Sequence, residues 1–199
     1  MITVTVVIIA YLLGSFPTAL VVCQRLYGVD IRQVGDGNMG TRNTLRNFGL
    51  WPSLAVLAGD FGKGALAVSF AHWTGQSFEW QALAGAAAIA GHDFPIFAGF
   101  KGGQGQATTL ATLLALFPEP TIVGLCVYGV AYIVTRSADL SAGLGCGVIA
   151  LLLVIFKQPD TFLIYTVATL LFIPFKKFID RHRVPQAESS SHKHVHLSS

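Results

Sequence analysis

The sequence is poor in charged residues. Asp, Glu, Lys and Arg make up 12% of its 199 residues, whereas hydrophobic residues make up 53%. An average soluble domain has about 25% charged residues, and the mean hydropathy of +0.61 is also high. We therefore predict an integral membrane protein whose solvent is the lipid bilayer. The net charge of +3 does not indicate a nucleic-acid partner, because the cations flank apolar segments, as is usual at cytoplasmic membrane faces.

Several other features are scarce or missing. The three cysteines, Cys23, Cys126 and Cys146, lie in apolar stretches, where a small buried hydrophobic residue is more common than a disulfide or a metal ligand. The alternating histidines of residues 192–196 lack a carboxylate or cysteine partner, so we expect no metal site there. No cofactor is expected. No repeat with a period of about 20 to 50 residues is present, which favours one compact domain.

Seven apolar runs follow one another along the chain. They cover residues 3–24, 52–72, 80–98, 106–117, 120–134, 140–156 and 160–175. Some are shorter than the roughly 20 residues that a perpendicular span needs. We therefore predict an all-α integral membrane protein with about seven short or tilted transmembrane helices. A five-span alternative would fuse residues 106–134 into one helix, but Pro118 and Pro120 argue against it.

The ends of the chain are expected to differ. The first run has no basic residue before it and no clear cleavage site, so we expect a retained helix rather than a signal peptide. We assign residues 1–178 to one polytopic membrane domain. The polar residues 179–199 are expected to form a disordered cytoplasmic tail.

The basic residues predict the orientation of the chain. With seven spans, one side carries Arg25, Arg32, Arg42, Arg46, Lys101, Arg136, Lys176, Lys177, Arg181, Arg183 and Lys193, and the other side carries Lys157 alone. Because cytoplasmic loops carry the excess of Lys and Arg, we predict the N-terminus outside and the C-terminus in the cytoplasm. Two glycine-rich stretches, residues 35–46 and 99–105, then both fall on the cytoplasmic side and can belong to one site.

The first glycine-rich stretch has the composition of a phosphate cradle, since glycines expose backbone N–H groups and arginines supply positive charge. Its Gly-x-Gly-x-x-Gly spacing does not indicate dinucleotide binding, because a membrane helix and not a strand precedes it. If Gly40 opens a helix, Arg42 and Arg46 share a face near its electropositive end. The candidate phosphate-binding residues are Gly37, Asn38, Gly40, Arg42, Asn43 and Arg46. The alternative is an ordinary basic loop beside lipid headgroups.

Asp60 and Lys63 lie inside an apolar run. Ionisable residues are costly at such a depth and are functional candidates, and at this spacing they can pair on one helix face. Lys63 is therefore a candidate phosphate-binding residue, and Asp60 is a candidate support for the site. The alternative is a structural ion pair that only holds helices together. The stretch is not a Walker loop, because Gly64 stands where Ser or Thr would bind magnesium.

The second glycine-rich stretch directly precedes an apolar run and can present further N–H groups to an anion. Its candidate phosphate-binding residues are Lys101, Gly102, Gly103, Gln104 and Gly105. His92, shortly before it, is a candidate general base or acceptor-orienting group, because imidazole titrates near neutral pH. The alternative for His92 is a hydrogen-bonding strut. Arg136 and Ser137 complete the cytoplasmic set as candidate support for the site, although alone they indicate only a turn.

These motifs resemble those of the bacterial acyl phosphate:glycerol-3-phosphate acyltransferases, the PlsY family. The matching motifs are Gly14-Ser15, Gly37-Asn38-x-Gly40-x-x-Asn43-x-x-Arg46, Asp60-x-x-Lys63-Gly64, and the run from Gly91-His92 to Ala107-Thr108. The resemblance extends from residue 8 to residue 155. It implies seven helices, an external N-terminus and an active site on the cytoplasmic side of the bacterial inner membrane.

The resemblance also implies a reaction. The family transfers a fatty acyl group from acyl phosphate to glycerol 3-phosphate, which gives lysophosphatidic acid and phosphate at an early step of phospholipid synthesis. Acyl phosphate already has a good leaving group, so the protein must mainly hold two phosphates, orient the hydroxyl and stabilise the oxyanion. No nucleophilic Ser or Cys stands out, which is compatible with direct transfer. The implied partners are the two substrates and the lipid bilayer.

Three departures from the family pattern affect phosphate handling. Asp36 stands where the family usually has Ser, Gln104 replaces a second Lys, and the tail lacks the family's His- and Asn-rich pattern. We hypothesise that Arg42 restores the positive charge that is lost. Two alternatives stay open. One is a catalytically weakened paralogue that binds lipid phosphates, and the other is a small-anion transporter, for which the sequence shows no paired discontinuous repeats.

Overall fold

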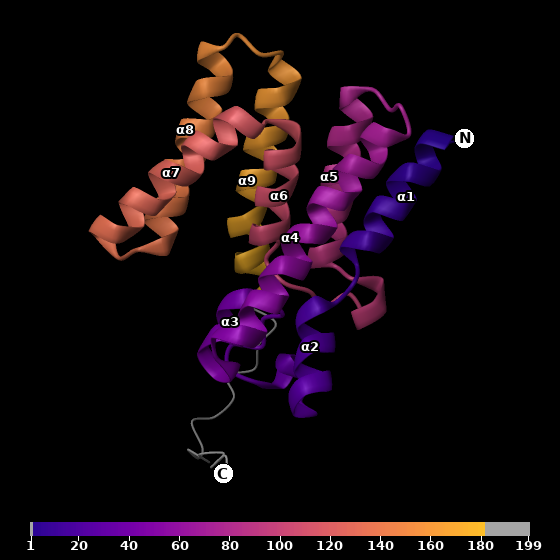
Figure 1. Cartoon of the computed structure of the whole chain (residues 1–199), viewed down its shortest axis with the longest axis vertical. Helices are drawn as coiled ribbons and strands as arrows, with labels where there is room; N and C mark the ends of the chain where they lie inside the picture. The colour runs from indigo at the N-terminus through magenta and orange to yellow at the C-terminus, as the bar shows by residue number, and fades with distance from the viewer. Residues whose placement is uncertain (1, 182–199) are drawn as a thin grey trace.

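The chain folds into helices alone over the residues that the structure, a computed structural model, describes. These are residues 2–181, with only the backbone described at 138, 139 and 181. The elements are α1 (Ile2–Gly14), α2 (Thr18–Tyr27), η1 (Ile31–Gln33), α3 (Thr41–Phe48), α4 (Leu50–Trp73), α5 (Phe78–Asp93), η2 (Ile96–Ala98), α6 (Gln106–Leu116), α7 (Pro118–Thr135), α8 (Ala138–Ile155) and α9 (Asp160–Arg181), where η marks a short 3-10 helix. Figure 1 shows their arrangement as a bundle of long helices with the shorter α2 and α3 at one end.

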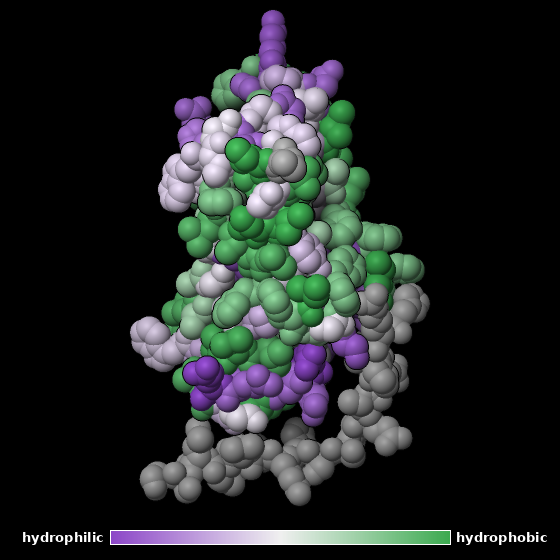
Figure 2. Space-filling view, turned by 90° about the vertical axis from the view of Figure 1, so that its right-hand side faces the viewer, coloured by the Kyte–Doolittle hydropathy of each residue, from purple (hydrophilic) through white to green (hydrophobic). Residues whose placement is uncertain are grey.

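The surface of the bundle is that of a membrane protein. Within the described residues, four segments are long and apolar enough to cross a bilayer, namely Ile2–Tyr27, Leu50–Trp73, Pro118–Thr135 and Asp160–Asp180. Figure 2 shows hydrophobic residues over the middle of the molecule and hydrophilic residues gathered toward both ends of its long axis. Lipid tails require such an apolar belt. The predicted class, an all-α integral membrane protein, is confirmed, while seven crossings stay a prediction.

The first apolar run is interrupted, although the sequence predicted a single helix. Its two parts, α1 and α2, are separated at residues 15–17. Pro17 lacks a backbone N–H and disfavours the helical conformation at Phe16, which explains the break. The carbonyl oxygen of Phe16 is thereby released from the helical ladder, and Nζ of Lys63 donates a hydrogen bond to it at 3.0 Å.

Two other boundaries bear on the predictions. Residues 106–134 form two helices, with α7 beginning at Pro118 directly after Phe117, as the prolines predicted. The last helix, α9, runs to Arg181, so residues 179–181 are helical and the predicted disordered tail began too early. Residues 182–199, with the tail histidines, lie outside the described residues.

Small residues bring the helices under the site close together. A Cβ at Gly14 would overlap the carbonyl oxygen of Ala88, which places the backbone of α1 directly on α5. A Cβ at Gly64 would lie 2.6 Å from the carbonyl oxygen of Thr108, which places α4 on α6. Small residues at contacts of this kind are typical of helix packing in membranes. They fix the positions of α5 and α6, the helices on either side of the second glycine-rich loop.

Candidate active site

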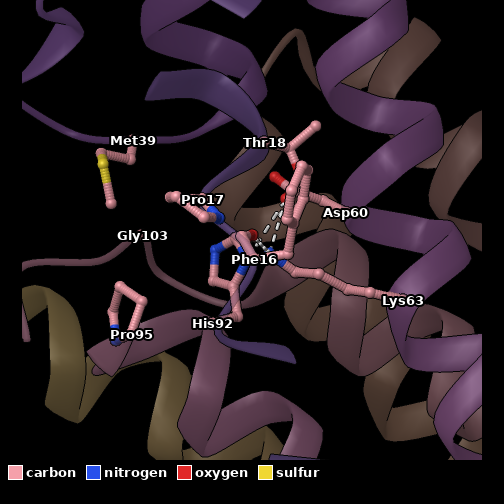
Figure 3. A pocket seen from close by; sticks show the side chains of 9 residues that line it. All are labelled: Phe16, Pro17, Thr18, Met39, Asp60, Lys63, His92, Pro95 and Gly103. Carbon is pink, nitrogen blue, oxygen red and sulfur yellow. Dashed lines mark hydrogen bonds and ion pairs between the residues drawn. The ribbon is translucent and has the colours of Figure 1, made fainter. Parts of the chain in front are cut away.

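A small cavity lies where the break between α1 and α2, the middle of α4 and the end of α5 meet. Its volume is about 10 Å³, and it is lined by Phe16, Pro17, Thr18, Met39, Asp60, Lys63, His92, Pro95 and Gly103. Figure 3 shows Asp60, Lys63 and His92 pointing toward one another at its centre. A cavity of this size holds about one water molecule, so a phosphate group does not fit inside it. Met39 comes from the first glycine-rich loop and Gly103 from the second, so both loops reach this point.

Asp60 and Lys63 form a buried ion pair on α4. Nζ of Lys63 lies 2.9 Å from Oδ1 of Asp60 and also donates to the carbonyl oxygen of Phe16. Lys63 is 7% exposed. Buried charges are tolerated when they are paired and hydrogen-bonded in this way. Lys63, predicted as a phosphate-binding residue, and Asp60, predicted as support for the site, are thus both buried and paired with each other.

His92 lies directly beneath the second glycine-rich loop. Its Nδ1 is 3.4 Å from Oδ1 of Asp60, and its carbonyl oxygen accepts a hydrogen bond from the N–H of Gly103 at 3.2 Å. A Cβ at Gly103 would overlap Nε2 of His92, so loop backbone covers that edge of the ring. The side chain is 5% exposed. Of the two sequence interpretations of His92, these contacts favour the strut over the general base.

The second glycine-rich loop leaves several donors free. In the part of the chain that the structure describes, the N–H groups of Gly102, Gln104 and Gly105 have no acceptor, whereas that of Gly103 is bonded to His92. The side chain of Lys101 is exposed. Free amides beside an exposed cation are the components of an anion site. Gly103, which the sequence placed in the same set, serves the attachment of the loop instead.

Asp93, the last residue of α5, lies against the N-terminal end of α6. It is fully buried, and a Cβ at Gly105, the residue before α6, would lie 2.8 Å from its Oδ1. Its two carboxyl oxygens accept no hydrogen bond from any described residue. A buried carboxyl group therefore faces the electropositive end of α6. Sequence reasoning did not select Asp93, although a carboxyl directly after His92 was the available signal.

A second ion pair, between buried Lys176 and partly exposed Asp180, comes from α9. Nζ of Lys176 is 2.7 Å and 2.6 Å from the two carboxylate oxygens of Asp180, and it lies 5.2 Å from the centre of the Phe94 ring. The ring face attracts a cation. Lys176 is completely buried, although the charge count used it as a cytoplasmic cation. Opposite charges four residues apart at the end of an apolar run were the sequence signal for this pair.

The first glycine-rich loop is organised by Asn43. This residue is buried, and its Nδ2 donates to the carbonyl oxygens of Val34 at 2.9 Å and Asn38 at 3.0 Å. The N–H of Gly37 donates to Val34 at 3.1 Å. Helix α3 begins directly after Gly40, as the sequence allowed. The donors of Asn43 and Gly37 are therefore engaged within the loop and stabilise its shape. Gly40 is the last loop residue before α3.

Asp36 lies beside Arg46 at the surface of the first loop. Oδ2 of Asp36 is 3.7 Å from Nη1 of Arg46, and the two side chains are 51% and 70% exposed. Exposed pairs of this kind contribute little to stability, about 0–1 kcal/mol. The aspartate nevertheless offsets the positive charge that Arg46 would offer to a phosphate.

Arg32 connects the segments that lead into the two loops. Its Nη2 donates to Oδ2 of Asp30 at 2.6 Å, and its Nη1 donates to the carbonyl oxygen of Ala98 at 3.2 Å. The guanidinium lowers the pKa of the Asp30 carboxyl, and hydrogen bonding to that carboxylate raises the pKa of Arg32. Ala98 directly precedes the second loop. The prediction that the two loops can belong to one site is thereby supported by a direct hydrogen bond.

Arg136 and Ser137 lie in the turn between α7 and α8. Oγ of Ser137 accepts a hydrogen bond from the N–H of Leu140 at 3.4 Å, so Ser137 caps α8. Arg136 is exposed at the end of α7. Neither residue lines the cavity at His92. Their hydrogen bonds serve the turn itself.

The arrangement suits a reaction between two anions. Exposed Arg46 and Lys101, together with free loop amides, can bind and orient phosphates and stabilise a developing oxyanion. Among the described residues, no three His, Cys, Asp or Glu side chains are grouped so that they could hold a metal ion.

Known proteins share both the sequence and the fold. The family described as glycerol-3-phosphate acyltransferase matches residues 4–183. Glycerol-3-phosphate acyltransferase 2 of Dehalococcoides mccartyi is 42% identical over 137 residues, which are 69% of this chain and 65% of that protein. The glycerol-3-phosphate acyltransferase of Trichormus variabilis is 36% identical, over 89% of this chain and 84% of its own length.

Two solved structures are similar over nearly the whole chain. Both are crystal structures of PlsY, described as an integral membrane glycerol 3-phosphate acyltransferase. Its glycerol 3-phosphate form has a TM-score of 0.81 and 30% identity, and it covers 92% of each chain. Its lysophosphatidic acid form has a TM-score of 0.79 and 29% identity. The chain therefore belongs to the glycerol-3-phosphate acyltransferase family, as its motifs predicted.

Proposed function

We propose that this protein transfers a fatty acyl group from acyl phosphate to a hydroxyl of glycerol 3-phosphate. The hydroxyl oxygen forms a bond to the acyl carbonyl carbon, and the bond from that carbon to the phosphate oxygen breaks. The electron pair leaves with phosphate, and the hydroxyl proton ends on phosphate or water. The products are lysophosphatidic acid and phosphate. Family membership supports the acceptor and the reaction class. Acyl phosphate is an anhydride with a good leaving group, so the transfer needs no protein nucleophile.

The observation that carries this proposal is the meeting of the two glycine-rich loops. Arg32 bonds the segment before one loop to Ala98 before the other, and both loops line the cavity at His92. Two phosphates bound there would lie close together, which transfer between them requires. We assign to phosphate binding the side chains of Asn38, Arg42, Arg46 and Lys101 and the amides of Gly40, Gly102, Gln104 and Gly105.

We also propose that all seven predicted segments cross the inner membrane of a bacterial cell, with the N-terminus outside and both loops in the cytoplasm. In Figure 1 the N-terminus lies at the opposite end of the bundle from α2 and α3, in keeping with this topology. In a cysteine-free background, a membrane-impermeant maleimide added to spheroplasts should label Ile2→Cys and spare Tyr27→Cys. The reverse pattern would refute the orientation.

The enzyme proposal is tested with purified protein, synthetic palmitoyl phosphate and radiolabelled glycerol 3-phosphate. We expect lysophosphatidic acid to form. Arg46→Gln and Lys101→Gln should each lower kcat/KM by about 10- to 100-fold, because a hydrogen bond to a charged group contributes roughly 1.5–3 kcal/mol. Lys157→Gln, an exposed change outside both loops, is the matched control and should match the unaltered protein. No product above the enzyme-free background from folded protein would refute the proposal.

The pair formed by Asp36 and Arg46 favours a second candidate, a weakened acyltransferase that binds lipid phosphates. Under our hypothesis, Arg42 compensates for the negative charge of Asp36. Arg42→Thr should then raise the KM for glycerol 3-phosphate, whereas Arg25→Thr, on α2, should not. Unchanged kinetics in Arg42→Thr would contradict compensation, and phosphate binding without turnover in the unaltered protein would favour the second candidate.

A further inference from the structure

Asp60 is connected to both ends of the second glycine-rich loop. On the near side, its Oδ1 is 3.4 Å from Nδ1 of His92, which precedes the loop. On the far side, its carbonyl oxygen accepts a hydrogen bond from Oγ of Thr108, in α6, at 2.9 Å. Lys63 holds the Asp60 carboxylate in turn, at 2.9 Å. One residue in the middle of α4 therefore contacts the chain on both sides of the loop.

The loop lies directly on His92. A Cβ at Gly102 would overlap the carbonyl oxygen of His92, and a Cβ at Gly103 would overlap its Nε2. The N–H of Gly103 is bonded to the same carbonyl oxygen. Any change in the position of His92 must therefore move these two glycines. They stand between Lys101 and the free amide of Gln104.

His92 is enclosed on every side that would face a substrate. The loop backbone covers Nε2, and Nδ1 faces Asp60. The cavity beside the ring has a volume of about 10 Å³, enough for about one water molecule and too small for a glycerol phosphate. Because Nδ1 faces a carboxylate oxygen at 3.4 Å, we assign the hydrogen of the neutral ring to Nδ1.

We propose that Lys63, Asp60 and His92 act as one buried positioning unit that holds Gly102 and Gly103 in place, so that Lys101 and the free loop amides are aligned for the phosphate of glycerol 3-phosphate. His92 is thus a positioning residue and does not take the proton of the acceptor hydroxyl. The unit acts on substrate affinity through the loop. This inference rests on the proposed acyl transfer for its kinetic test only.

Three substitutions of His92 distinguish a positioning residue from a general base. His92→Asn keeps a nitrogen donor at the position of Nδ1 and cannot act as a base near neutral pH. His92→Gln places its nitrogen one bond further out, away from Asp60. His92→Phe keeps a ring under the loop without any donor. For each variant, kcat and the KM for glycerol 3-phosphate are measured between about pH 5.5 and 8.5, a range that brackets the ordinary imidazole pKa.

We expect His92→Asn to stay within about threefold of the unaltered protein in both constants, with the same pH profile. In His92→Gln and His92→Phe the loop shifts and one of its donors loses its hydrogen bond to the charged phosphate. The KM should therefore rise at least about tenfold, while kcat stays within about threefold. A large fall of kcat in all three variants, together with loss of the acidic limb of the pH profile, would overturn the proposal in favour of a base. Unchanged KM values in all three would overturn it as well. If His92→Phe does not elute as folded protein in detergent, the comparison of Asn with Gln carries the test.

A second measurement does not depend on turnover. Amide hydrogen exchange of a peptide covering residues 99–106 should be faster in His92→Gln than in His92→Asn, because the Gly103 amide loses its support. A peptide covering residues 78–88, in α5 before the site, serves as the control. Equal exchange of the loop peptide in both variants contradicts positioning. Failure of the unaltered protein to make lysophosphatidic acid would refute the proposed function and leave the exchange result standing.

Discussion

Asp36 and Arg46 face each other across the first glycine-rich loop, with 3.7 Å between Oδ2 and Nη1. Asp36 also accepts a hydrogen bond from the N–H of Asn38 at 3.1 Å. The residue that departs from the family pattern thus contacts two of the residues we assign to phosphate binding. Its effect on the site is electrostatic, because both charged side chains are exposed and neither holds the fold together.

We predict that Asp36→Ser lowers the KM for glycerol 3-phosphate. Two charges about 4 Å apart in water interact by about 1 kcal/mol, so the change should be a few-fold. It should shrink as salt is raised, since surface charges are screened. Asp160→Ser, at the start of α9, is the control. Equal KM values for Asp36→Ser and the unaltered protein at low salt would show that Asp36 does not oppose phosphate binding.

Gly103→Ala should weaken both stability and activity. The added Cβ would overlap Nε2 of His92, and overpacking of this kind costs about 1–3 kcal/mol. Thermal unfolding in detergent and the KM for glycerol 3-phosphate report the two effects. Gly62→Ala is the matched control, because a Cβ there has no neighbour within 4 Å. A Gly103→Ala protein as stable and as active as Gly62→Ala would contradict the close contact.

Asp60→Asn should be strongly destabilising. It leaves the ammonium of Lys63 buried without its carboxylate, and breaking a buried pair costs about 3–5 kcal/mol. When Asp60→Asn is combined with Lys63→Met, the free energy of unfolding should fall by less than the sum of the two single decreases. A double-mutant cycle measures this difference. Asp36→Asn, which removes an exposed pair, should cost no more than about 1 kcal/mol. Additive losses at Asp60 and Lys63 would mean that the two side chains do not interact.

The contact between Asp30 and Arg32 should make stability depend on pH. The pKa of Asp30 is lowered in the folded chain, so its charge stabilises the fold above the unfolded pKa of about 3.9 and stops doing so as pH falls through the lower folded value. The unfolding temperature of the unaltered protein should exceed that of Asp30→Asn at pH 7 and approach it under acid conditions. A constant difference down to about pH 3 would exclude Asp30 as the cause.

Much of the fold was predictable because it rests on local signals. Apolar runs predicted the helices, and Pro118 separated α6 from α7 because a proline cannot continue a helix. Pro17 likewise ends a helix, but the apolar residues on both sides of it led to the prediction of one continuous helix. The end of α9 was misplaced because the helix continues past Phe178 through the charged residues Asp180 and Arg181.

The site was harder to predict, because its geometry depends on residues far apart in the chain. The glycines and cations of both loops were identifiable by composition. The buried state of Lys63 and Lys176 was not, because other helices cover these side chains only after packing. Their carboxylate partners lie one turn away on the same helices, whereas the Phe16 carbonyl oxygen that Lys63 binds comes from a distant part of the chain. Asp93 was missed because its place at the N-terminal end of α6 is created by the turn at Gly105.

The sequence by itself determined the solvent of this protein, its helical class and the two glycine-rich loops to which we assign phosphate binding, because composition, hydropathy and glycine spacing are local properties. The tertiary structure alone decided which polar groups are exposed at the loops and which are buried beneath them. Burial and pairing set that division. Arg46 and Lys101 stay at the surface, whereas Asp60, Lys63 and His92 are enclosed and paired, because an unpaired charge inside the bundle would cost more free energy than its burial gains.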